Sequence, residues 1–162
     1  MHTKRRSLAL DILLGAAAGA AGTYLMDKVT TLAYEREPKA AQEREENARG
    51  DKTAYVKAAQ KLGAPEEMQE AIGQAIHWSL GVGAGALYGV LRNRMRKLGL
   101  GSGLAYGAAF WLVMDEGATA LLQLTPPPQR FPWQTHARGL AGHLVLGGTI
   151  EAAFDAVDLA RL

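Results

Sequence analysis

The most constraining feature of this sequence is its division into long apolar stretches separated by charged segments. A bilayer core about 30 Å thick is crossed by roughly 20 helical residues at a rise of about 1.5 Å each. Four stretches reach that length without an internal proline: residues 8–33, 71–91, 101–124 and 136–157. The sequence therefore predicts an all-α integral membrane four-helix bundle, with residues 1–162 forming a single membrane domain.

The average composition conceals this segregation. Mean hydropathy is −0.07, which is typical of a soluble protein. The stretches score modestly because they contain alanine and glycine rather than leucine and isoleucine. Small residues let helices approach closely in lipid, so we expect helix packing at Gly15, Gly19, Gly81, Gly85, Gly89, Gly103 and Gly107, with Gly99 continuing the third series. A soluble bundle rich in alanine and glycine is the alternative.

Several functional classes are disfavoured by composition and motifs. The absence of cysteine excludes disulfides, Fe–S clusters and thiolate metal sites. A formal net charge of +2 argues against nucleic-acid binding. No phosphate-binding loop, nucleophile elbow or H-E-x-x-H zinc motif occurs. We therefore expect no enzyme activity, and the sequence leaves any cofactor unknown.

Basic residues predict the orientation. They precede the first stretch and fill the connection between the second and third: Lys4, Arg5, Arg6, Arg92, Arg94, Arg96 and Lys97. The positive-inside rule then places both termini in the cytoplasm. Asp11 interrupts the first stretch, so we interpret that stretch as a retained span rather than a cleaved signal peptide.

The segment 35–70, called the connector below, carries seven basic and nine acidic residues. Its turn residues predict three helices: one over 38–49, a second with Asp51 as its N-cap that ends near Gly63, and a third that starts at Pro65. The third helix should continue into the second stretch. We expect a charged helical extramembrane cap that contacts a partner or shields a site, although a solvated linker fits the pattern equally well.

The chain also shows signs of an internal duplication. The first stretch aligns with the third through Gly15, Gly19, Met26 and Asp27 against Gly103, Gly107, Met114 and Asp115. The second aligns with the fourth through His77 and Gly81 against His143 and Gly147. This pattern predicts two hairpins of the same orientation, as in transporters with parallel repeats.

Ionisable residues inside the stretches are the main functional candidates, because charge is costly in a bilayer. Counting along the helices places Asp27, His77, Asp115 and His143 in one layer, roughly 4–10 Å outside the midplane. Such a cluster suits a Zn²⁺, Mn²⁺ or Fe²⁺ site, a proton relay, haem ligation by both histidines, or hydrogen bonds that hold helices together. Three further residues could extend a relay: His136, Glu116 and Glu151. Glu116 adjoins Asp115, so we expect it to face another direction.

The pattern resembles the YagU-like family of small bacterial inner-membrane proteins. The resembling features are the glycine-rich first stretch ending in Met26-Asp27, the charged connector, the Met114-Asp115-Glu116 stretch and the histidine-bearing helices. That family has no established molecular activity, and acid resistance is implied for some members. The resemblance implies an inner-membrane location and favours a proton-linked function.

The sequence therefore predicts a polytopic inner-membrane protein whose Asp/His cluster handles protons or metal ions. The first alternative is a non-catalytic structural or assembly subunit, whose partners would be other membrane subunits or another copy of the chain. The second is a membrane cytochrome with haem bound by two histidines. In each case the lipid bilayer is the expected surrounding.

Overall fold

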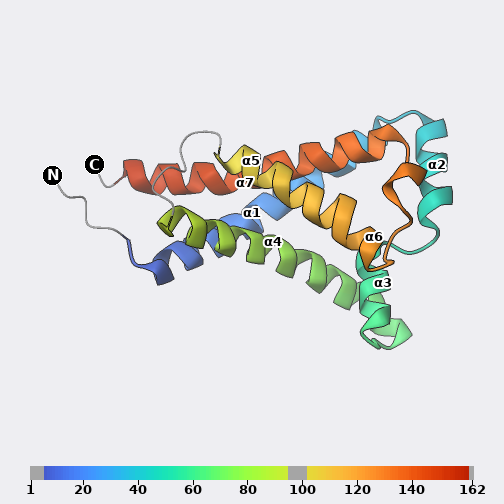
Figure 1. Cartoon of the computed structure of the whole chain (residues 1–162), viewed down its shortest axis with the longest axis horizontal. Coiled ribbons are helices and arrows are strands. Elements are labelled where there is room, and N and C mark those ends of the chain that lie inside the picture. Colours follow the sequence, from blue (N-terminus) through green and yellow to red (C-terminus); the bar gives the residue numbers. More distant parts are fainter. Residues whose placement is uncertain (1–5, 95–101, 161–162) are drawn as a thin grey trace.

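The computed structural model describes residues 6–94 and 102–160, and all regular structure in these ranges is helical. Three long helices run along the molecule: α1 (Leu8–Glu35), α4 (Gln69–Arg94) and α7 (Trp133–Leu159). A fourth helical segment joins α5 (Ser102–Trp111), η2 (Leu112–Ala118) and α6 (Thr119–Leu121). The helices α2 (Lys39–Arg49) and α3 (Ala54–Lys61) lie together at one end of this bundle (Figure 1).

Short 3₁₀ turns precede two of the long helices. They are η1 (Glu66–Met68) before α4 and η3 (Pro128–Arg130) before α7. Pro65 and Pro132 occupy the positions just before η1 and α7, where a missing N–H removes no helical hydrogen bond. Predictions that involve Lys4, Arg5, Arg96, Lys97, Gly99 and Gly101 lie outside the described residues.

Two of the helices, α1 and α7, are long and apolar enough to cross a membrane by length and composition. They contain the first and fourth predicted stretches. The second and third stretches, which fall on α4 and on the α5–η2–α6 segment, are not among the candidate spans in the described residues. The protein is thus an all-helical chain with two candidate membrane-spanning helices.

Glycines set the distance between neighbouring helices. Helix α1 packs on α4 and α7, and α5 packs on α7. A Cβ atom added to Gly15 would overlap the carbonyl oxygen of Gly85, and one added to Gly103 would overlap that of Gly147. An added Cβ would also overlap a backbone carbonyl oxygen of the opposing helix at Gly19, Gly85, Gly89 and Gly107, whereas at Gly81 it would overlap the Thr23 side chain.

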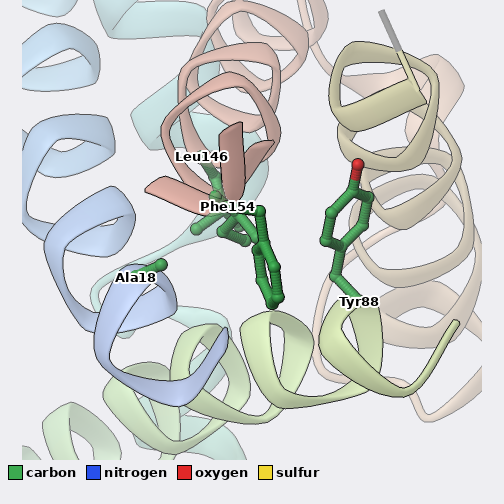
Figure 2. Close-up of a cluster of buried hydrophobic side chains, with 5 residues drawn as sticks. Ala18, Tyr88, Leu146 and Phe154 are labelled. Carbon is green, nitrogen blue, oxygen red and sulfur yellow. The ribbon is translucent and has the colours of Figure 1, made fainter. Parts of the chain in front are cut away.

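The apolar core is small and lies between α1, α4 and α7. Its buried members are Ala18, Tyr88, Leu146, Ile150 and Phe154. Figure 2 shows Phe154 beside Tyr88, and their ring centroids are 5.8 Å apart in an edge-to-face arrangement. So few large side chains fill the core because the glycine contacts already bring the backbones together.

Large apolar side chains instead point outward. Leu13 is 65% exposed on α1, and Val113 is 62% exposed on η2. The buried positions of α1 are almost all small or polar: Asp11, Gly15, Ala18, Gly19, Gly22 and Thr23. This distribution is the reverse of that in a soluble helix, where the apolar face turns inward.

Ion pairs close the end of the bundle opposite α2 and α3. Asp11 accepts hydrogen bonds from Arg6 Nε at 2.6 Å and from Asn93 Nδ2 at 2.7 Å. Arg92 pairs with Asp155 and Asp158 of α7. The charge of Asp11 is therefore satisfied inside the protein, at the start of α1.

The glycine contacts generate a first prediction. Gly85→Ala places a methyl group against the backbone of Gly15 and Gly19, which cannot move aside as a side chain can. We expect it to lower the free energy of unfolding by about 1–3 kcal/mol, measured by thermal unfolding in detergent.

Gly83→Ala is the matched control on the same helix. No atom lies within 4 Å of its added Cβ, so stability should stay the same or rise by up to about 1 kcal/mol. Equal destabilisation by the two substitutions would contradict this account of the helix contacts.

Candidate functional site

A cavity of about 600 Å³, the large cavity below, opens where α2 and α3 meet the bundle. Its walls come from α1, α2, α3, α4, α7 and the α5–η2–α6 segment. Among the ionisable candidates predicted from sequence, five line it: Asp27, His77, Asp115, Glu116 and His136. Candidates that are distant in the chain are therefore gathered around one space.

The predicted cluster is organised as two Asp–His pairs. His77 Nε2 lies 2.9 Å from Asp27 Oδ1, which joins α4 to α1. His143 Nδ1 lies 3.7 Å from Asp115 Oδ2, which joins α7 to η2. His143 Nδ1 also donates a hydrogen bond to the Gly139 carbonyl at 2.9 Å, so this nitrogen carries a proton.

A small cavity of about 20 Å³ lies where the two pairs approach each other, lined by Asp115, His143 and His77 among others. This volume holds about one water molecule and leaves no room for a porphyrin between the two imidazoles. Within residues 6–94 and 102–160, no three His, Asp or Glu side chains converge as a metal-ligand set. The metal hypothesis for Asp27, His77, Asp115 and His143 therefore lacks a three-ligand site in this part of the chain.

A π-helical turn, η2, carries the acidic pair of the third stretch. Its i→i+5 hydrogen bonds widen the turn and bring successive side chains closer to one face. Asp115 and Glu116 both line the large cavity. Their histidine partners differ, because Asp115 lies against His143 and Glu116 lies against His136.

Glu116 pairs with a histidine at the start of α7. His136 Nδ1 lies 2.7 Å from Glu116 Oε1, and His136 Nε2 lies 3.2 Å from the Pro128 carbonyl oxygen. Both oxygens are acceptors when Glu116 is ionised, whereas a neutral imidazole has only one N–H. Both contacts are hydrogen bonds only if one extra proton is present. That proton lies either on the second ring nitrogen of His136 or on the carboxyl group of Glu116.

Glu151 has a different position. Its carboxylate accepts hydrogen bonds from Ser102 Oγ and from the backbone N–H of Gly103, each at 3.1 Å. It thus caps the first turn of α5, where N–H groups lack helical partners. Eight residues of α7 separate it from His143, which corresponds to about 12 Å. The predicted relay residues are therefore split between the two ends of α7.

The connector supplies a residue that sequence reasoning missed, Tyr55. Its ring centroid lies 4.8 Å from that of His77, and the residue lines both cavities. Burial raises the pKa of the Tyr55 phenol, and the carboxylates of Asp115 and Asp27 raise this pKa further. The phenol is therefore a neutral hydroxyl near both acidic groups. The available signal was that Tyr55 is the only aromatic residue between positions 35 and 70.

Helix α3 holds Tyr55 in place by packing on α4. Val56 and Ala59 are buried, and a Cβ on Gly73 would lie 3.1 Å from the backbone nitrogen of Val56. The N-cap of α3 is Thr53, whose hydroxyl accepts from the Val56 N–H at 3.3 Å. The prediction of Asp51 as N-cap is wrong, because the helix begins at Ala54, three residues after Asp51.

Helix α2 is fixed to the bundle by polar contacts. Arg138 of α7 pairs with Glu37 and Glu45, and Thr135 Oγ1 donates to Glu45 at 2.8 Å. The side chain of Gln42 donates to the Tyr34 carbonyl at the end of α1, at 2.6 Å. The connector is therefore a helical cap docked on the bundle rather than a solvated linker.

The Tyr55 environment predicts a pH effect on stability. The unfolded chain releases the phenol proton near its ordinary pKa of 10.0, whereas the folded protein holds it to higher pH. The free energy of unfolding therefore falls as pH rises above 10, by about 1.4 kcal/mol at pH 11. The Tyr55→Phe substitution removes this contribution. Thermal unfolding of both proteins between pH 7 and 11 measures it.

Tyr24→Phe serves as a matched control, because Tyr24 is 53% exposed on α1. Its alkaline loss of stability should match that of the unmodified protein. If Tyr55→Phe loses as much stability at pH 11 as the unmodified protein does, the assigned environment of Tyr55 is wrong.

Comparison with known proteins identifies the family. Residues 47–152, about two thirds of the chain, match the family described as "Protein of unknown function (DUF1440)". This match covers α3, α4, the α5–η2–α6 segment and most of α7. No curated protein and no solved structure matches the chain. The chain belongs to the uncharacterised DUF1440 family.

Proposed function

We propose that this protein is a four-helix bundle of the bacterial inner membrane that transfers protons through two pairs, Asp27–His77 and Asp115–His143. The observation that carries the proposal is the grouping of both pairs around the large and small cavities. Each pair joins an imidazole to a carboxylate, and both groups are able to accept and donate protons.

The outward leucines support the membrane location. Helices α1 and α7 meet the length and hydropathy needed for spanning, and α4 and α5 pack directly on them. Small and polar residues face inward while leucines face outward, as expected when lipid is the solvent. The proposed topology has spans near 8–33, 71–91, 101–124 and 136–157, with both termini in the cytoplasm and α2 and α3 outside. An uncharacterised family is consistent with the YagU-like resemblance.

The two hairpins support an internal duplication. In α1 and α4, Asp27 meets His77, and in the second hairpin Asp115 meets His143. Glycine contacts join the helices in both hairpins. The proposed halves would each contribute one Asp–His pair to the centre of the bundle, as expected for parallel repeats.

The proposed route for protons begins at the mouth of the large cavity. The His136–Glu116 pair lines this cavity, and Glu116 is adjacent in sequence to Asp115. Asp115 leads to His143 and, across the small cavity that all three line, to His77 and its partner Asp27. From His143, α7 continues to Glu151, near the start of α5. Water would carry the proton between His143 and Glu151, across about 12 Å.

Reconstitution in liposomes tests this function. Liposomes with a pH-sensitive dye inside and a potassium diffusion potential across the membrane report proton entry. We expect the unmodified protein to raise this rate above that of protein-free liposomes. His77→Gln and His143→Gln should each lower the protein-dependent rate at least about tenfold, because each removes a proton acceptor.

Glu67→Gln provides the control, because it removes an exposed carboxylate of η1 that does not line the cavity. The protein-dependent rate should not change. A rate equal to that of empty liposomes, or an undiminished rate in the His77→Gln, His143→Gln double variant, would refute the proposal. The Asp27–His77 hydrogen bond and the Asp115–His143 contact would then serve only to hold helices together.

A further inference from the structure

The large cavity has an excess of negative charge. Five carboxylates line it, from Asp27, Glu45, Glu70, Asp115 and Glu116, together with two guanidinium groups. With neutral histidines its wall therefore carries a formal charge of −3. A concave wall of one sign concentrates ions of the opposite sign, so the cavity favours cations.

The two arginines on the wall are already engaged by acidic side chains. Arg138 pairs with Glu37 and Glu45, and Arg49 lies 3.6 Å from Glu45. These contacts take up the positive charge at the α2 side of the cavity. The other carboxylates of the wall come from α1, α4 and η2. Besides the two arginines, the only lining side chains that can carry a positive charge are the imidazoles of His77 and His136.

Aromatic side chains form part of the same wall. Tyr55, Trp111 and Phe131 line the cavity, contributed by α3, α5 and the segment before α7. Trp111 and Asp115 both lie against Gly139: its added Cβ would be 2.9 Å from Trp111 Nε1 and 3.4 Å from Asp115 Oδ2. A carboxylate beside an aromatic ring is an arrangement that recognises organic ammonium groups.

The dimensions favour an organic cation over an inorganic one. A volume of about 600 Å³ is within the range of small-molecule sites. No metal-ligand set of three side chains forms in the parts of the chain that the structure describes. We propose that the large cavity binds a small organic cation with a primary or quaternary ammonium group, held by Asp115 and Glu116 against Tyr55 and Trp111.

This inference deepens the proposed function, because it uses the same cavity and names a ligand for it. Three probes of nearly equal shape isolate the role of charge: tetramethylammonium (+1), tert-butanol (neutral) and pivalate (−1). Binding is followed through the indole N–H signals of ¹⁵N-tryptophan-labelled protein in detergent, with Trp111→Phe assigning the Trp111 signal. The protein also contains Trp78 and Trp133, which do not line the cavity.

We expect tetramethylammonium to shift the Trp111 signal saturably, with no saturable shift from tert-butanol, pivalate or potassium ions. Asp115→Asn should weaken binding at least about tenfold, because it removes a charge next to the ammonium group. Tyr55→Leu should weaken binding as well, whereas Tyr55→Phe retains the aromatic face and should bind normally. Glu67→Gln, which removes a carboxylate outside the cavity, should also bind normally.

An equal response to tert-butanol, pivalate or potassium ions would overturn the inference. Unchanged binding in both Asp115→Asn and Glu116→Gln would overturn it as well. Two separate variants are used so that misfolding of one does not prevent the test. If protons enter the liposomes but no ammonium ion binds, the cation site is rejected and the proposed proton transfer stands. If ammonium ions bind but no protons enter, the proposed proton transfer is rejected and the cation site stands.

Discussion

Direct backbone contact between glycine-lined helix faces is the constraint on which the other features of this structure depend. Gly15 and Gly19 meet Gly81 and Gly85, and equivalent contacts join α5 to α7. Because these backbones touch, short side chains can reach across the interface. The 2.9 Å contact between Asp27 and His77 is one consequence, and the small size of the apolar core is another.

The connector completes the site that the long helices begin. Helices α2 and α3 are docked by Arg138, Glu45 and close packing against Gly73, so they form a wall of the large cavity. Tyr55 extends from this wall to the ring of His77. The highly charged segment thus contributes an aromatic hydroxyl to a cavity whose acidic groups come from α1, α2, α4 and η2.

Much of the architecture could be predicted from residue patterns. Proline and glycine positions indicated helix ends at Arg49 and near Gly63, and the two helices end at Arg49 and Lys61. The π-helical turn at Asp115 could not be predicted, because no residue in Leu112–Ala118 signals an i→i+5 pattern. The docking of Tyr55 depended on tertiary packing between α3 and α4, which local patterns do not record.

By itself, the sequence determined an all-helical chain, glycine-lined helix faces and a short set of ionisable residues inside apolar stretches. These properties follow from local periodicity and from the cost of burying charge. Only the tertiary structure decided that Asp27 meets His77, that Asp115 meets His143 and that Tyr55 reaches both cavities. The partners in each case lie far apart in the chain, so their contact depends on how separate helices pack, which no local pattern encodes.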